Sequence, residues 1–393
     1  MAKATKPNSQ TRSKPSSSRS SKPKAMSKAK SISSNKADPV ISTHSKATPI
    51  PNEIILHILT HLSDHQPSLL SCILVSKSFH TLASPFLWTS LKLTPFSITT
   101  RPGDSTSQPN RLEDPKKSHC GALGTGKKDL KHLLKHVQKV YLQSHTPEWC
   151  LHSHSSSLRL PNLDVLDLDI IPQPGARKVH LTDPMRGGGY NPTCRLLRDL
   201  SPSRVILRDN FNKGLDLSKG AIPTSIWKCV DELVLVSEVR DIPSLGLEPV
   251  TAPIPITLKN LERLIWIFLP SNEEKVMYRL DAPHRPDLYN AMQIINLIVQ
   301  LDHLKSVKLV NPGVLGGLIE ENGGATRDQL HFETCDYIRG KFGEETRKRG
   351  WMEGKIAEVR GRIEFMGLEE WGEEGGWVGR FDEGEIDGWM GGI

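Results

Sequence analysis

The stretch PIPNEIILHILTHL, Pro49–Leu62, decides how the 393-residue sequence is interpreted. Its aliphatic residues recur with the spacing of one helix face: Ile54, Ile55, Ile58, Leu59 and Leu62. Pro51 suits the first turn of a helix, where its missing N–H would have no partner. Glu53 complements the positive end of the helix dipole. The stretch therefore predicts a short amphipathic helix.

Two more short helices are predicted in the segment LLSCILVSKSFHTLASPFLW, residues 69–88. Leu69, Leu70, Ile73 and Leu74 form one apolar face, and Phe79, Leu82, Ala83, Phe86 and Leu87 form the next. Three short helices in about forty residues cannot bury so much apolar surface among themselves. Unless the rest of the chain covers this surface, the module is built to dock against a partner.

These two stretches resemble an F-box. The family's recurring steps are represented in order by Ile50-Pro51, Glu53-Ile54, Val75-Ser76-Lys77 and Leu87-Trp88. Ile50 replaces the usual Leu, and Phe79 stands where a Trp is common; both changes keep an apolar side chain. An ordinary helical hairpin of an unrelated domain is the alternative interpretation of residues 49–93.

The resemblance implies a substrate-recognition adaptor of a cullin–RING ubiquitin ligase of the SCF type. Such an adaptor binds a Skp-type linker protein, and through it a cullin, while another domain holds a protein substrate. The linker-binding residues that it implies are Ile50, Pro51, Ile54, Ile55, Ile58, Leu59, Leu70, Leu74, Val75, Phe79, Leu82, Leu87 and Trp88. A leucine-rich scaffold or interaction protein unrelated to ubiquitination is the competing hypothesis.

A second pattern follows the helical module. Several runs share a template of Leu-x-x-Leu-x-x-Leu-x-Leu or a relaxed form of it, at Val140, Leu166, Leu233, Leu264 and Val307, with a weaker candidate at Val205–Leu207. Each run predicts a turn followed by a short strand, and stacked copies would form a parallel sheet around one core. The runs are about 26 to 43 residues apart, more uneven than the ~20–29 of typical leucine-rich repeats.

The predicted fold class is therefore mixed α and β. A three-helix F-box module precedes an irregular leucine-rich-repeat-like solenoid with parallel strands, in which neighbouring strands follow chain order. A non-repeating α/β domain with similar strands is the alternative. The predicted segments are a disordered basic Ser/Lys-rich tail (1–47), the F-box module (48–93), a linker (94–129), the repeat-like recognition domain (130–340), and an amphipathic helix with an acidic Gly/Trp-rich tail (341–393).

Charge is distributed unevenly along the chain. Residues 1–49 hold nine Lys and two Arg against a single acid, Asp38, whereas the remainder holds 40 basic and 43 acidic residues. Because the positive charge belongs to the tail, it is weak support for a nucleic-acid-binding domain. The tail is either a nuclear-import or polyanion-binding patch or a solvated segment.

The cellular location is predicted from what the sequence lacks. It has no apolar stretch near the ~20 residues of a membrane helix and no secretory h-region. Its six cysteines are scattered, which is typical of a reduced intracellular protein. We expect the cytoplasm, the nucleus or both.

No constellation of catalytic residues stands out, so the chain is predicted not to be an enzyme and to need no cofactor or metal. Gly121, Gly126 and Lys127 have phosphate-loop spacing, but Lys128 follows instead of Ser or Thr and no apolar strand precedes them. The histidines between 119 and 154 and Cys150 match no familiar zinc spacing.

Two expectations concern the remaining segments. Met352, Ile356, Val359, Ile363 and Met366 predict one amphipathic helix that caps the solenoid or docks on a partner, and the acidic Gly-rich residues after it are expected to be disordered. Substrate recognition is expected on the repeat region and its polar insertions, about residues 172–195 and 240–257.

Overall fold

The computed structural model describes residues 50–63, 65–93, 131–143, 158–169, 194–210, 222–239, 256–270, 286–315 and 327–391. The chain divides into two units, residues 1–50 and 51–393. The predicted basic tail and the predicted linker lie outside the described residues, and so does the phosphate-loop-like sequence. The account that follows concerns the second unit.

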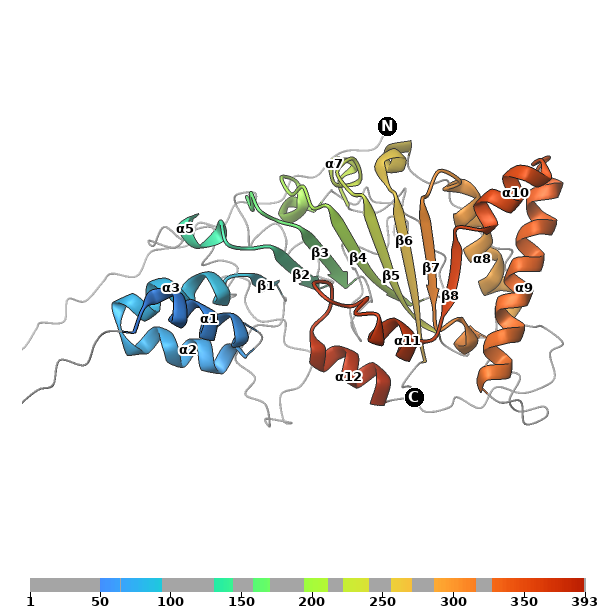
Figure 1. Cartoon of the computed structure of the whole chain (residues 1–393). Helices are drawn as coiled ribbons and strands as arrows, with labels where there is room; N and C mark the ends of the chain where they lie inside the picture. Colours follow the sequence, from blue (N-terminus) through green and yellow to red (C-terminus); the bar gives the residue numbers. More distant parts are fainter. Residues whose placement is uncertain are drawn as a thin grey trace, which may run out of the picture. The chain divides into compact units, whose positions relative to one another are not determined.

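Three helices open this unit, as the apolar spacing predicts. They are α1 (Asn52–His61), α2 (Gln66–Val75) and α3 (Lys77–Leu87) (Figure 1). The Ser76 hydroxyl caps α3 by accepting a hydrogen bond from the Phe79 backbone N–H at 3.2 Å. The helices share a small core whose buried members are Ile55, Leu59, Leu69 and Ala83.

An eight-stranded sheet follows, with every neighbouring pair parallel and the strands in chain order (Figure 1). The strands are β1 (Ser90–Leu93), β2 (Lys139–Gln143), β3 (Val165–Asp169), β4 (Arg204–Asn210), β5 (Glu232–Val239), β6 (Arg263–Pro270), β7 (Ser306–Val310) and β8 (Ile363–Met366). The predicted parallel pairing and sequential strand order are confirmed for β2 to β7, and β1 and β8 extend the sheet beyond the predicted domain of residues 130–340.

One face of the sheet, here called the leucine face, carries two apolar rows that run across all eight strands. The rows are Leu91, Val140, Leu166, Val205, Leu233, Leu264, Val307 and Ile363, and Leu93, Leu142, Leu168, Leu207, Leu235, Trp266, Leu309 and Phe365. Alternate residues of a strand point to the same face, so the Leu-x-Leu steps of the template build these rows. They are the centre of the largest core cluster.

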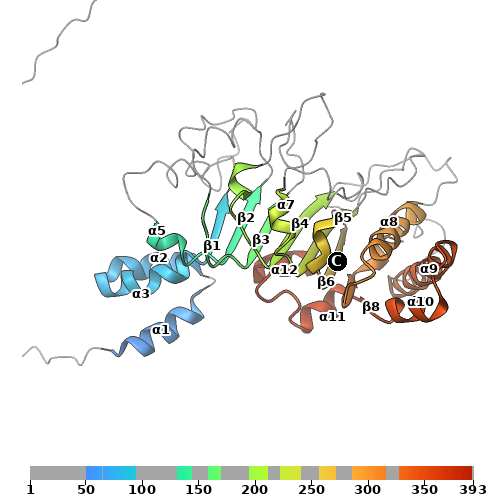
Figure 2. The same ribbon diagram turned by 90° about the horizontal axis from the view of Figure 1, so that it is seen from above.

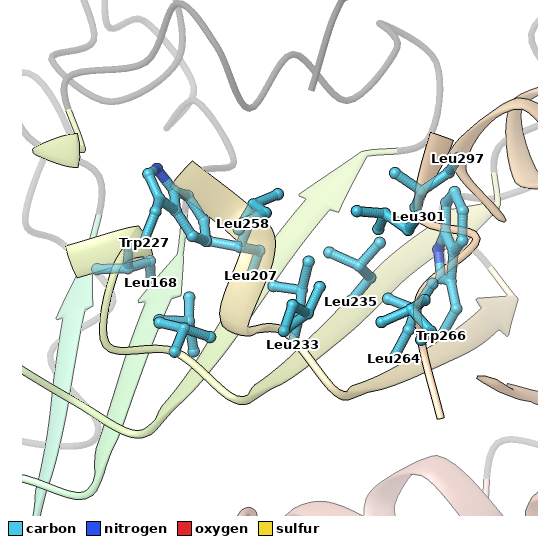
Figure 3. Close-up of a cluster of buried hydrophobic side chains, with 14 of the residues drawn as sticks. Leu168, Leu207, Trp227, Leu233, Leu235, Leu258, Leu264, Trp266, Leu297 and Leu301 are labelled. Carbon is cyan, nitrogen blue, oxygen red and sulfur yellow. The ribbon is translucent and has the colours of Figure 1, made fainter. Parts of the chain in front are cut away.

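Short helical segments cover the leucine face. Trp227 at the end of α7 (Thr224–Trp227), Leu258 in η4 (Ile256–Asn260) and Leu297 in α8 (Pro286–Gln300) pack over the strands (Figure 3). The further segments α5 (Lys131–Leu134) and η2 (Arg195–Leu197) precede β2 and β4. The arrangement repeats a turn, a strand and a return segment.

Side-chain amides link successive copies of this unit. Asn162 Nδ2 donates to the Lys135 carbonyl at 2.7 Å, and Asn260 Nδ2 donates to the Lys228 carbonyl, also at 2.7 Å. Asn311 follows β7 with a φ of 59° and donates to the Phe268 carbonyl at 3.0 Å. Asn tolerates this left-handed conformation better than most residues.

The segment after β7 differs from the prediction. Helix α9 (Arg327–Lys348) and helix α10 (Glu353–Arg360) come first, but the predicted single helix from Met352 to Met366 ends at Gly361. Its second half is β8, because Ile363 and Phe365 extend the two rows of the leucine face along the free edge of β7. The expected helix was wrong over residues 363–366.

The expected disordered tail was also wrong over the described residues. Helices α11 (Leu368–Glu373) and α12 (Glu383–Gly391) fold against the face opposite the leucine face, and Figure 2 shows them on the other side of the sheet from α7 and α8. The glycines that suggested disorder allow turns, since Gly375 and Gly379 have positive φ values of 68° and 74°. A Cβ at Gly376 would overlap the Trp371 indole.

Candidate partner-binding surfaces

An apolar surface is exposed on the three-helix module. It is called here the exposed helical surface, and its exposed large apolar side chains are Ile54, Ile58, Leu70, Leu74 and Val75. Ile54 and Ile58 are each 51% exposed, and Leu74 is 84% exposed. Large aliphatic side chains left this open on one small module are typical of an interaction site.

The structure divides the predicted linker-binding residues into two groups. Ile50, Pro51, Ile54, Ile58, Leu70, Leu74 and Val75 are exposed. Ile55 and Leu59 are buried in the module core, against which Phe79, Leu82 and Leu87 pack, and Trp88 packs on the core of the sheet. The second group therefore shapes the core of the module, and the first group is open to solvent.

Leu56 is also exposed on the module but does not belong to this surface. It is 39% exposed and lies on α1 away from the stripe made by Ile54 and Ile58.

The face opposite the leucine face, called here the mixed face, has two parts. Toward β5–β7 it is apolar, and Val234, Ile265 and Val310 are buried beneath the C-terminal segment of residues 368–391. Trp371, Phe381 and Ile386 of that segment are also buried there. Toward β1–β4 the face also carries polar and charged side chains beside the buried Val165 and Ile206, and these polar side chains form a second candidate surface.

A buried carboxylate fastens the C-terminal segment to the sheet. The Glu232 side chain is fully buried and accepts two hydrogen bonds from Arg380, at 2.6 and 2.8 Å. Arg263 lies 3.3 Å and Arg204 3.9 Å from the same carboxylate. Burial alone would raise the pKa of Glu232, but the hydrogen bonds from Arg380 and the three guanidinium charges outweigh it and lower that pKa.

A second charged group lies nearer β1. Arg208 donates to both Asp167 oxygens, at 2.7 and 2.8 Å, and also pairs with Glu385 at the start of α12. Its guanidinium lies 5.8 Å from the centre of the Tyr141 ring. Burial alone would lower the pKa of Arg208, but its bonds to the two carboxylates raise it.

Beside this group is an open pocket of about 460 Å³, called here the edge pocket. It is lined by Ser90, Lys92, Lys139, Tyr141, Asp167, Arg208, Asp382, Gly384 and Glu385. The Tyr141 hydroxyl donates to Asp169 at 2.9 Å. Burial first, and then the charge and hydrogen bond of Asp169, raise the pKa of Tyr141, so its phenol stays protonated.

Several candidate metal ligands and most of the insertions expected to bind a substrate lie outside the described residues. Cys150, His152 and His154 lie outside the described residues, as do nearly all residues of the insertions 172–195 and 240–257. Within the described ranges there is no group of three or more His, Cys, Asp or Glu side chains that could hold a metal ion. No helix in those same ranges is long and apolar enough to cross a membrane.

Comparison with known proteins identifies the part of the chain that carries the exposed helical surface. Residues 49–94 match the family model described as F-box-like. The chain therefore carries an F-box-like domain, which confirms the resemblance recognised in the sequence. No curated protein and no solved structure matches the chain.

Proposed function

We propose that the protein is a non-enzymatic substrate-recognition adaptor of an SCF-type cullin–RING ubiquitin ligase. Its F-box-like domain would bind a Skp-type linker, and through it a cullin, while the sheet domain holds a protein substrate. The observation that carries the proposal is the exposed helical surface, because it lies within the residues that match the F-box-like model. We place this activity in the cytoplasm or nucleus, where such ligases work.

The chemistry would come from other subunits of the ligase. An adaptor acts by raising the effective concentration of a substrate near the ubiquitin-carrying enzyme, so it needs two separate binding surfaces and no catalytic group. The exposed helical surface and the mixed face are formed by different residues, which suits this requirement.

We also propose that the sheet domain is an irregular leucine-rich-repeat solenoid. Two features support this proposal: the sequential parallel strands and the rows of the leucine face. The Asn162 and Asn260 side chains, which bond the turn of the preceding copy, add a third. Stacked units of this kind present a broad surface on which binding residues can be placed.

Linker binding by the full chain tests the adaptor proposal. Ile54 and Ile58 are half exposed, so covering them would contribute about 1 kcal/mol each. A buried unpaired carboxylate costs several kcal/mol more. We expect the double variant Ile54→Asp/Ile58→Asp to bind a Skp-type linker at least ~100-fold more weakly than the unchanged chain in isothermal titration calorimetry.

Phe332→Asp is the matched control, because Phe332 is another exposed apolar side chain, at 69%, and lies on α9 outside the F-box-like domain. This variant should bind the linker with unchanged affinity. No binding by the unchanged chain would refute the adaptor proposal and favour a leucine-rich scaffold unrelated to ubiquitination. Equal losses in both variants would show that the exposed helical surface is not the linker site.

A further inference from the structure

The mixed face is only partly available to a substrate. The C-terminal segment covers its apolar part. Three side chains of this segment, Trp371, Phe381 and Ile386, are buried against the sheet. The edge pocket lies where this cover ends, between β1–β4 and the start of α12. At this pocket the mixed face is open and hollowed.

We propose that the edge pocket binds an anionic side chain of a substrate protein, with Lys92 and Lys139 as its cationic partners. Asp382 of the chain itself occupies that position when no substrate is bound. This inference deepens the proposed function, since it names the substrate chemistry that the adaptor would recognise.

The arrangement of charge around Asp382 carries the argument. Its two oxygens lie 3.6 Å from Lys92 Nζ and 3.6 Å from Lys139 Nζ, which is too long for a charge-assisted hydrogen bond. Two ammonium groups thus share one carboxylate. In the part of the chain that the structure describes, neither makes a hydrogen bond to a protein acceptor, although Lys139 is only 16% exposed.

The other charged side chains that line the pocket form a separate group. Arg208 uses its guanidinium on Asp167 and Glu385, and both Asp167 oxygens are taken by that contact. One guanidinium is thus shared by two carboxylates, so this group holds an excess of one negative charge. Three cationic and three anionic side chains line the pocket, and its excess positive charge lies only at Lys92 and Lys139 beside Asp382, so an anion fits that end of the pocket.

Asp382 is well placed to leave. It is 62% exposed and stands at the turn before α12, so it can turn toward water without disturbing the buried Phe381 beside it. An incoming glutamate, aspartate or phosphorylated side chain could come closer to the lysines than 3.6 Å and gain hydrogen bonds from them. Phosphate, with more than one negative charge, would match the two ammonium groups more fully.

Arrays of short peptides test the proposal without the linker protein. Each peptide with a central glutamate or phosphoserine has a twin in which that residue is glutamine or serine, with the same flanking residues. The labelled full chain is applied, and the measurement is the ratio of binding to anionic peptides over binding to their neutral twins. The glutamate and phosphoserine arms distinguish a plain acidic segment from a phosphorylated one.

The variants should move this ratio in opposite directions. Asp382→Asn removes the internal competitor, so the ratio should rise by about two- to five-fold, the range of a partly exposed ion pair. Lys92→Gln/Lys139→Gln should bring it close to one. Glu383→Gln is the matched control, because Glu383 is an exposed neighbouring carboxylate that does not line the pocket, and it should leave the ratio unchanged.

Equal binding of the anionic and neutral twins by the unchanged chain would overturn the proposal. So would a ratio that falls in Asp382→Asn, or one that the lysine variant leaves unchanged while its circular dichroism spectrum stays that of the folded protein. Since the array contains no linker, any of these results leaves the test of the F-box-like domain intact.

Discussion

The contact between Arg380 and Glu232 should fasten the C-terminal segment to the sheet, and Arg380→Met tests this. Arg380 supplies two hydrogen bonds to a fully buried carboxylate, at 2.6 and 2.8 Å. Hydrogen bonds to charged groups contribute about 1.5–3 kcal/mol each, and breaking a buried ion pair costs about 3–5 kcal/mol. Arg263, at 3.3 Å, remains to offset part of that loss. We expect the free energy of unfolding to fall by about 2–3 kcal/mol.

The effect is measured by urea unfolding followed by circular dichroism, together with hydrogen exchange of the amides of α11 and α12. At the sensitivity of a domain of this size, the loss corresponds to a fall in Tm of about 5–10 °C. Exchange in α12 should accelerate more than exchange in β5, because the contact fastens the C-terminal segment, which contains α12, to the sheet, which contains β5.

A double-mutant cycle separates this contact from a general loss of packing. In Glu232→Met/Arg380→Met neither member of the pair is left buried without its partner, so this double variant should be more stable than Arg380→Met. A change below about 0.5 kcal/mol in Arg380→Met would show that the contact does not stabilise the fold. A double variant less stable than the sum of the two single changes would also contradict the reasoning.

Two other predictions follow from the same cover. Trp371→Ala should lower the free energy of unfolding by about 3–5 kcal/mol in urea unfolding, because Trp371 is 1% exposed, whereas Met352→Ala at an 80% exposed site should change it by less than about 0.5 kcal/mol; equal effects would show that the segment is not packed. The pKa of Glu232 is lowered in the folded protein, so its ionised form stabilises the fold. This stabilisation is fully present above about pH 5, where an ordinary Glu with a pKa of 4.5 is ionised, and it is lost as the pH falls through the lower folded-state pKa. Thermal unfolding at stepped pH values should therefore show a gap between the unchanged chain and Glu232→Gln that is constant above pH ~5 and narrows below it; a gap that widens on acidification would contradict this sign.

The sequence predicted the sheet well because one physical pattern repeats. The template that contains Leu166 and Leu168 also contains Leu233 and Leu235, and alternation along a strand turns both pairs to one face. A parallel pairing then puts equivalent residues side by side, so strand order follows from stacking. The F-box-like domain was recognised for a similar reason, as several short motifs stood in the right order.

The C-terminal cover was missed because its own sequence carries little signal. Its glycines and acids are typical of disorder, and isolated residues such as Trp371 and Ile386 show no helical period. The signal lay instead in the strands it covers. Runs such as LVLV in β5 and LIWIF in β6 are apolar on both faces, which indicates that both faces are buried. The sequence interpretation assigned a core to one face of these strands and predicted no segment to cover the other face.

The edge pocket could not have been predicted at all. Its lysines come from β1 and β2, and Asp382 follows more than two hundred residues later. No local spacing relates these positions, because the fold alone brings them together.

The position of the cover in the chain has a consequence for synthesis. A ribosome makes residues 368–391 after all eight strands, so a nascent chain can complete its sheet while Val234, Ile265 and their neighbours are still bare. During that interval the growing chain exposes the apolar part of the mixed face to chaperones. A premature stop before Leu368 would leave this apolar surface permanently exposed. Transcripts cut short at this point should yield a protein that quality control removes, even though every strand of its sheet is present.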